Sequence, residues 1–193
     1  MSKQTIWAFL KSNGLPDEAV AGIMGNFEAE SNCEACRLQG DFSPTRQTSR
    51  RYADMVNTGT MAVDAYVMDA KGWGLAQWTY YTRKQNLLKF CQSQGKGIED
   101  ETAQLNFFLA EMQNEFPTVW KGLLSCKDIR TAAYLVCHNY ERPAFENTEV
   151  RTSLAQKIYD EFHGQPVATA PAADDKTTKA IALLKQAIEL LGG

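Results

Sequence analysis

Two glutamates stand at the end of a predicted amphipathic helix, in the stretch AGIMGNFEAESNCEA over residues 21–35. At 100° per residue, Glu30 lies about 80° to one side of the helix's apolar stripe and Glu28 about 80° to the other. The two carboxylates therefore point apart and share no site while both are helical. Negative charge at a helix C-terminus opposes the helix dipole. Such a placement raises the pKa of a carboxyl slightly, and a raised pKa suits a general acid that works near neutrality. The more common interpretation of such residues is two partly exposed glutamates without a catalytic role.

An aromatic run lies downstream, in DAKGWGLAQWTYYTRKQ over residues 69–85. Its rings stand beside two glycines and an amide side chain, which is an uncommon composition for a core helix. Flat amphipathic rings and amide donors suit stacking on sugar faces and hydrogen bonding to hydroxyl and acetamido groups. The alternative is an aromatic cluster that covers the core. The residues concerned are Trp73, Gln77, Trp78, Tyr80 and Tyr81.

Helical periodicity recurs along the chain and has to position these residues. A first helix is expected before Gly14, and a second opens with Pro16 near its first position and acids in its first turn. Further helices fit residues 79–94, 100–115, 127–139 and 146–162. At most a small β-hairpin fits, within residues 36–60. The predicted fold class is therefore mainly α.

The predicted catalytic domain spans residues 1–163 and is followed by a change of composition. Residues 164–178 are rich in Pro, Ala, Thr and Asp without periodicity, which indicates a linker. Residues 179–193 then form an amphipathic helix with coiled-coil spacing. A helix this short is marginal alone in water, so we expect it to pack on its own domain or to mediate self-association. Its apolar positions are Ile181, Leu184, Ile188 and Leu191.

Composition excludes several classes of partner. The chain has 193 residues, 44% hydrophobic and 10% aromatic, which is typical of one folded domain with a sizeable core. Its formal net charge is −3, so it lacks the basic excess that binding to nucleic acid or to an anionic membrane surface requires. The N-terminal stretch MSKQTIWAFLKSNGL has too short an apolar run for a signal peptide or a membrane span. Synthesis in a cytoplasm is therefore expected.

Five sequence blocks resemble, in order and spacing, the phage-tail-type lysozyme domain of Gram-positive phage endolysins and tail-tip hydrolases. The blocks are GIMGNFEAES, GWGLAQWT, RKQNLL, QLNFFLAEM and YERPA, and the resemblance runs over residues 3–163. A more distant similarity is to goose-type lysozymes and lytic transglycosylases, which share a Glu-Ser at a helix end. The resemblance implies a lysozyme-like, mostly helical fold that cleaves peptidoglycan between N-acetylmuramic acid and N-acetylglucosamine.

The resemblance also implies roles for individual residues. The catalytic glutamate of the family precedes a serine, which here is Glu30 followed by Ser31, and Glu28 is then a solvated helix residue. Glu30 is expected to act as the general acid. The resemblance places Gln77, Trp78, Tyr140 and Glu141 at the cleft. With Trp73 and Tyr80 of the aromatic run, they are the side chains expected to bind the sugar.

A second catalytic carboxylate is the open part of this mechanism. Retaining enzymes place it about 5–5.5 Å from the acid, and inverting enzymes about 6.5–9.5 Å away. Asp41 and Asp69 are the candidates, and Asp69 is preferred because it adjoins a block expected to line the cleft. For each of them, a structural role in a loop or a helix cap is the more common alternative to a catalytic one. The substrate's acetamido group, or a glutamate acting alone, would make a second carboxylate unnecessary.

The cysteines indicate no cofactor. The family usually continues Glu-Ser-Gly-hydrophobic-x-Pro, whereas this chain has a pair, Cys33 and Cys36, in that loop. No second Cys-x-x-Cys and only two histidines accompany the pair, so zinc is not expected. Reduced thiols are the default after cytoplasmic synthesis, with Cys33 and Cys36 near enough to oxidise. Cys91 and Cys137 fall at apolar helix positions and are expected in the core.

Two other functions use the same features. A lytic transglycosylase would employ the same glutamate and leave 1,6-anhydro ends, and a non-catalytic wall-binding or tail-structural module would bind peptidoglycan without cleaving it. The expected location is the host cytoplasm during synthesis, followed by action on the bacterial wall after release through a holin pore or delivery in the virion.

Overall fold

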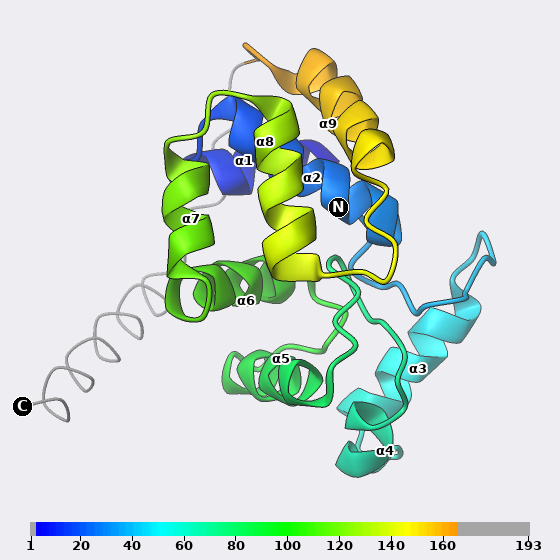
Figure 1. Cartoon of the computed structure of the whole chain (residues 1–193). Coiled ribbons are helices and arrows are strands. Elements are labelled where there is room, and N and C mark those ends of the chain that lie inside the picture. Colours follow the sequence, from blue (N-terminus) through cyan, green and yellow to red (C-terminus); the bar gives the residue numbers. More distant parts are fainter. Residues whose placement is uncertain (1–2, 166–193) are drawn as a thin grey trace, which may run out of the picture.

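Nine α-helices and one π-helical segment form residues 3–165, the part of the chain that this computed structural model describes (Figure 1). They are α1 (Lys3–Ser12), α2 (Asp17–Ser31), α3 (Gln47–Asn57), α4 (Val63–Val67), α5 (Tyr81–Ser93), α6 (Glu101–Asn114), α7 (Pro117–Leu124), α8 (Ile129–Tyr134), η1 (Leu135–Glu141) and α9 (Thr148–Phe162). The predicted fold class, mainly α, is confirmed. The predicted linker beyond residue 165 and the predicted helix at 179–193 lie outside the described residues.

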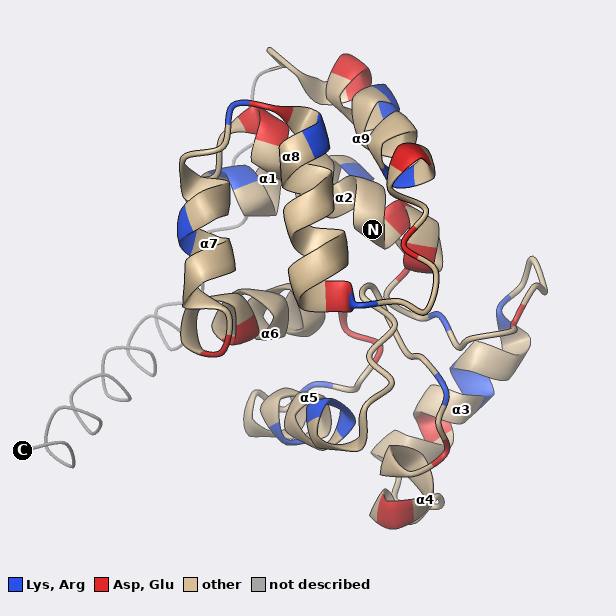
Figure 2. Cartoon of the chain, viewed as in Figure 1, with Lys and Arg blue, Asp and Glu red and all other residues tan. Residues whose placement is uncertain are grey.

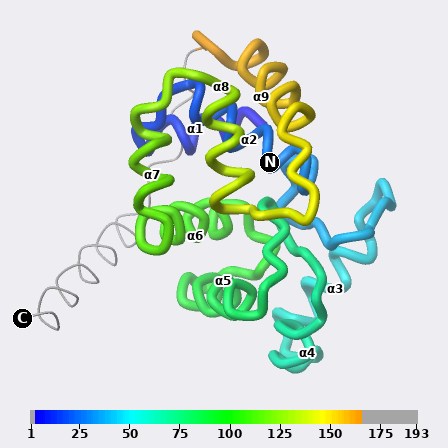
Figure 3. Tube along the Cα trace, in the orientation of Figure 1, coloured from blue at the N-terminus to red at the C-terminus, as the bar shows by residue number. Residues whose placement is uncertain are grey.

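Helix α2 lies in the middle of the fold and packs against α1, α8 and α9 (Figure 3). Two glycines permit the close crossings, because a Cβ at Gly22 would lie 2.5 Å from the Cβ of Ala132 in α8. A Cβ at Gly25 would lie 2.6 Å from the Cβ of Ala155 in α9. The side chain of Phe27, further along α2, meets Phe108 of α6 edge to face at 5.1 Å. Helix α2 is thus held on several sides before it reaches its C-terminal end.

The end of α2 is capped by a left-handed residue. Asn32 has φ 57°, and its backbone N–H donates to the carbonyl of Glu28 at 3.0 Å. The N–H of Cys33 donates to the carbonyl of Phe27 at 3.2 Å, so two terminal carbonyls of the helix are satisfied. The cap stops the helix directly after the Glu30–Ser31 pair.

Helices α3, α4 and α5 lie on the other side of α6 from α8 (Figure 1). The loop from α4 to α5 contains a tight turn, in which Trp73 forms isolated bridges with Leu38 and with Trp78. The N–H of Trp78 donates to the carbonyl of Trp73 at 3.0 Å, and that of Trp73 to Trp78 at 3.2 Å. This turn faces the end of α2, and it brings the aromatic run beside the Glu-Ser pair.

Three helices, α3, α4 and α7, are not predicted from the sequence. Helix α3 buries Ser49 and Tyr52 beside two small apolar side chains, so few large apolar residues mark its inward face in the sequence. Helix α4 has only five residues. The helix predicted at 127–139 is instead α8 continued by the π-helical segment η1. Within residues 3–165, the allowance for a β-hairpin at 36–60 reduces to one isolated bridge from Leu38.

Charge is spread over the described surface rather than gathered by sign. In the view of Figure 2, acidic and basic residues are interspersed along the helices. Within residues 3–165, no helix combines the length and the apolar character needed to cross a bilayer.

Candidate active site

A groove of about 1000 Å³ lies between the end of α2, the α4–α5 loop and the segment that follows η1. Its walls include Glu30, Gln77, Tyr80, Tyr140 and Glu141, which brings together five of the residues predicted from the sequence. Apolar and aromatic side chains alternate there with charged ones, as is common in saccharide and ligand sites. A smaller pocket of about 370 Å³ near the start of α8 contains none of the predicted site residues.

Glu30 faces the groove because Ser31, its neighbour, is buried on the other side. The hydroxyl of Ser31 lies 2.9 Å from the carbonyl oxygens of both Phe27 and Leu75. It can therefore hold the last turn of α2 against the aromatic turn that forms the opposite wall. The Glu-Ser pair thus combines one residue that faces the groove with one that fixes the helix end.

The carboxylate of Glu30 is paired with a buried arginine of α9. The Nη2 atom of Arg151 lies 2.5 Å from Oε1 of Glu30. The same guanidinium donates to Oδ1 of Asn26 at 3.0 Å and to the carbonyl of Glu146 at 2.9 Å. Asn26, fully buried, in turn donates to the carbonyls of Gly22 and Ala133. Arg151 is therefore fixed in direction, and it balances the charge of Glu30.

Glu28 points away from the groove, as its helical position predicts. Its Oε1 accepts from Lys3 of α1 at 2.7 Å, and the side chain is half-buried. The expectation that Glu28 is a solvated helix residue is therefore wrong in part, since it forms an ion pair between two helices. The pair places Glu28 among the residues that hold α1 on α2.

A charged network lies under the other wall of the groove. Arg83 of α5 forms a bidentate ion pair with buried Glu111 of α6, with N···O distances of 2.9 and 2.8 Å. Tyr140 donates from its hydroxyl to Oε2 of Glu111 at 2.7 Å, and the indole N–H of Trp78 donates to the same oxygen at 2.8 Å. Burial raises the pKa of Tyr140 well above its ordinary value, so its hydroxyl stays a neutral donor. This network fixes both Tyr140 and Arg83.

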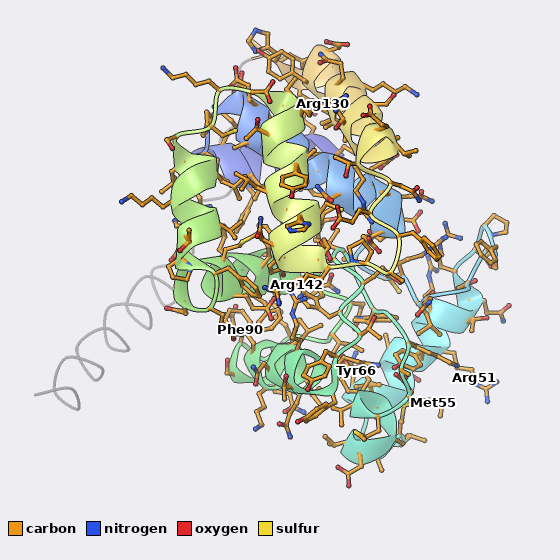
Figure 4. The ribbon with its side chains drawn as sticks, viewed as in Figure 1. Arg51, Met55, Tyr66, Phe90, Arg130 and Arg142 are labelled. Carbon is orange, nitrogen blue, oxygen red and sulfur yellow. The ribbon has the colours of Figure 1, made fainter. Side chains whose placement is uncertain are left out.

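Glu141 follows Tyr140 and ends the π-helical segment η1. Its side chain lines the groove, its Oε1 is shielded from solvent, and this oxygen has no hydrogen-bond partner among the described residues. Burial raises the pKa of Glu141 well above its ordinary value, and the negative charge of Glu30 adds to the shift. Arg83 and Arg151 act in the opposite direction. Beyond Glu141, Arg142 adopts a left-handed conformation and adds a cation to the groove wall (Figure 4).

The aromatic run divides into buried and exposed rings. Trp73 and Trp78 are fully buried, and the indole N–H of Trp73 donates to the carbonyl of Ile98 at 2.9 Å. Neither ring lines the groove, so their predicted contact with sugar is not supported. Tyr80 and Tyr81 line it instead, with ring centroids 4.7 Å apart and large exposed surfaces. These two rings offer the flat faces that the composition of the run predicts.

Gln77, which also lines the groove, is held by its amide. Its Nε2 donates to the carbonyls of Gly74 at 2.9 Å and Arg37 at 3.1 Å. Its backbone is left-handed, with φ 46°. The amide donors are thus committed to the turn itself, and Gln77 shapes the groove wall through them.

Neither candidate for the second carboxylate reaches the groove wall. Asp69 pairs with the fully buried Lys84 at 2.5 Å and accepts a hydrogen bond from the hydroxyl of Tyr52. Asp41 is buried and accepts from the backbone and the hydroxyl of Ser49, at 2.9 and 2.6 Å. Both carboxylates are therefore committed to structural contacts, as the alternative interpretation of each proposes.

Sequence reasoning does not identify the arginines of this site. Arg83 and Arg151 lie on the helices predicted at 79–94 and 146–162, where an arginine is normally a solvated residue. Their partners, Glu111 and Glu30, are distant in sequence, so no local sequence pattern predicts the two ion pairs. Within the described residues, no group of three or more His, Cys, Asp or Glu side chains is arranged to hold a metal ion.

A comparison with known families bears on this groove. The model of the phage tail lysozyme family matches residues 2–162. The chain belongs to the phage tail lysozyme family. It is accordingly a lysozyme-like enzyme that acts on peptidoglycan, and the match covers every helix of the described structure.

Proposed function

We propose that this protein is an N-acetylmuramidase that hydrolyses the bond between N-acetylmuramic acid and N-acetylglucosamine, with Glu30 as the general acid. The observation that carries the proposal is the position of Glu30 in a groove of about 1000 Å³, in a chain of the phage tail lysozyme family. In this reaction Glu30 donates a proton to the glycosidic oxygen as the bond breaks toward an oxocarbenium-like state.

The groove offers the other groups that such a reaction needs. Tyr80 and Tyr81 present exposed rings on which sugar faces can stack. Arg142 supplies a cation for the carboxylates that peptidoglycan stems carry. For Glu30 to act as an acid it must hold a proton in the substrate complex, so its ion pair with Arg151 has to be released on binding.

The setting we propose is that of a phage lytic enzyme, either an endolysin or a virion-associated hydrolase. It would be made in the host cytoplasm and reach the wall through a holin pore or within the virion. Family membership supports both routes equally. Detection of the protein in purified virions by mass spectrometry separates them, since an endolysin is absent from washed particles.

Substitution of Glu30 tests the mechanism. Glu30→Gln keeps the size of the side chain and an acceptor for Arg151 but has no proton to donate, so lysis should fall by about 10²–10⁴-fold. Glu28→Gln is the matched control, because it changes the same residue type on the same helix outside the groove. Turbidity loss of purified Gram-positive cell walls measures both. Undiminished lysis by Glu30→Gln, with Glu28→Gln also active, would refute the assignment.

Product analysis tests the reaction type. Hydrolysis yields reducing ends that carry one added water, whereas a lytic transglycosylase yields 1,6-anhydro ends. Mass spectrometry of digested glycan distinguishes them, and anhydro products would overturn the hydrolase proposal. Binding to peptidoglycan without any soluble fragments would point instead to a wall-binding module.

A further inference from the structure

The groove contains a carboxyl group that the predicted mechanism does not use. Glu141 lines the same groove as Glu30 but comes from η1, which is far from α2 in the sequence. Its Oε1 is shielded from solvent and has no hydrogen-bond partner among residues 3–165. A buried carboxyl oxygen without a partner is uncommon, because an unpaired buried polar atom lowers stability. The side chain as a whole is only half-buried and lines the groove, so a bound water or substrate can reach it from there.

The charged groups around Glu141 come from four helices. Glu30 of α2 and Glu111 of α6 disfavour its ionised form, while Arg83 of α5 and Arg151 of α9 favour it. Burial is the largest of these influences, and it raises the pKa of Glu141. The surroundings of Glu141 therefore favour its protonated form, whereas Glu30 has the direct contact with Arg151.

We propose that Glu141 is the second catalytic carboxyl of this enzyme, the general base that takes the proton of the attacking water while Glu30 acts as the acid. The inference rests on the proposed glycan hydrolysis and adds a residue to it. It replaces Asp41 and Asp69, whose carboxylates are held by Ser49 and Lys84 away from the groove wall.

Arg151 makes a transfer of charge between the two carboxyls possible. It contacts Glu30 directly, and its field also favours ionised Glu141. When sugar fills the groove, the proton moves to Glu30 through exchange with solvent, and the negative charge moves to Glu141. The net charge of the pair is unchanged, and the two arginines still balance it. The pair behaves as one coupled titrating unit with a single proton.

The bond changes then balance. Glu30 donates its proton to the glycosidic oxygen, and the bond between C1 and that oxygen breaks. Water attacks C1, its proton passes to the carboxylate of Glu141, and the new C1–O bond leaves a reducing end. The enzyme now has a protonated Glu141 and an ionised Glu30. These are the protonation states that we assign to the free groove, so each turnover regenerates the starting state of the enzyme.

The local backbone is consistent with a functional placement of Glu141. It lies in a π-helical segment of seven residues that interrupts the regular course of α8. Such segments are rare and are frequent at functional sites, since the extra residue changes the direction of the side chains that follow. Tyr140, adjacent to Glu141, is fixed by Glu111 at 2.7 Å, which anchors the end of the segment.

Kinetics of Glu141→Gln on peptidoglycan fragments test the inference. We expect kcat/KM to fall by about 10²–10⁴-fold, as for loss of a general base. The bell-shaped pH profile of the parent enzyme should also lose its acidic limb, because only Glu30 then titrates. Glu141→Asp keeps a carboxylate and should recover part of the rate and both limbs. Thermal unfolding of each variant confirms that it is folded.

The outcomes separate this inference from the proposed function. If the parent enzyme releases no reducing ends, the proposed hydrolysis itself fails. If the parent cleaves and Glu141→Gln retains kcat/KM within about threefold with both limbs present, only the role of Glu141 is overturned. A folded Glu141→Gln that loses rate while keeping the full bell shape would assign Glu141 to substrate binding and would also overturn the general-base role.

Discussion

The glycines of α2 allow a quantitative prediction about how the site is positioned. An alanine Cβ at Gly22 would meet Ala132 at 2.5 Å and the backbone nitrogen of Ala133 at 2.7 Å. Overpacking costs about 1–3 kcal/mol, and backbone atoms cannot move aside as a side-chain end can, so the upper value applies. The better helix propensity of alanine stabilises the folded state by about 1 kcal/mol and offsets part of this cost. Gly22→Ala should therefore lower the free energy of unfolding by about 2 kcal/mol.

Thermal unfolding followed by circular dichroism measures this loss, which corresponds to a Tm lower by about 4–8 °C for a domain of this size. Gly122→Ala in α7 is the matched control, since its Cβ would meet only the end of the Leu135 side chain, at 3.3 Å. The control should be neutral or slightly stabilising. Equal Tm values for Gly22→Ala and the parent protein would refute the argument that α2 is held by close backbone crossings.

Two further predictions concern the charges of the fold. Hydrogen bonds from serines lower the pKa of Asp41 in the folded protein below its ordinary value of 3.8. Ionised Asp41 therefore stabilises the fold at pH values above 3.8, and this contribution is lost as the pH falls through the lower pKa of the folded state. Asp41→Asn should therefore flatten the acid side of the stability curve, measured as urea midpoints against pH. Arg83→Met removes the partner of Glu111, which is 2% exposed, and should lower the free energy of unfolding by about 3–5 kcal/mol in urea titrations.

Each of these has a contradicting result. An Asp41→Asn variant with the same loss of stability in acid would show that other groups control that pH dependence. An Arg83→Met variant as stable as the parent would show that the ion pair with Glu111 contributes no net stability. The double variant Arg83→Met with Glu111→Leu should recover most of the stability, because it leaves no unpaired buried charge.

The helices with continuous apolar stripes could be predicted from the sequence. The structure places α5, α6 and α9 at Tyr81–Ser93, Glu101–Asn114 and Thr148–Phe162, within two residues of the predicted limits at each end. Large apolar residues recur in them over three or more turns, which is the pattern that predicts a helix. Helix α3 has few large apolar residues on its inward face, and one of its inward positions is Ser49, which is buried because it binds Asp41. A polar residue buried by a tertiary partner is invisible to periodicity.

The candidate site shows a similar division. The placement of Glu30 at a groove follows from the Glu-Ser pair, but the sequence did not show which aromatic rings are buried and which are exposed. Trp73 and Trp78 are buried because their indole N–H groups find acceptors inside, at Ile98 and Glu111. Tyr80 packs instead against the neighbouring ring of Tyr81 and stays 62% exposed. Which rings reach a ligand depends on these distant acceptors, and neighbouring residues do not reveal them.

The second carboxyl illustrates why spacing along the chain misleads in this fold. Asp69 adjoins the aromatic block and Glu141 is about seventy residues further on, yet the groove contains Glu141 and excludes Asp69. The difference lies in the counter-ions: among the described residues, the fully buried Lys84 pairs with no carboxylate but Asp69, whereas Glu141 shares its two arginines with Glu30 and Glu111. A carboxyl that has a buried cation to itself is held in place by that contact. One that shares its cations can change charge during a reaction, and that property, rather than proximity in sequence, distinguishes the candidate base.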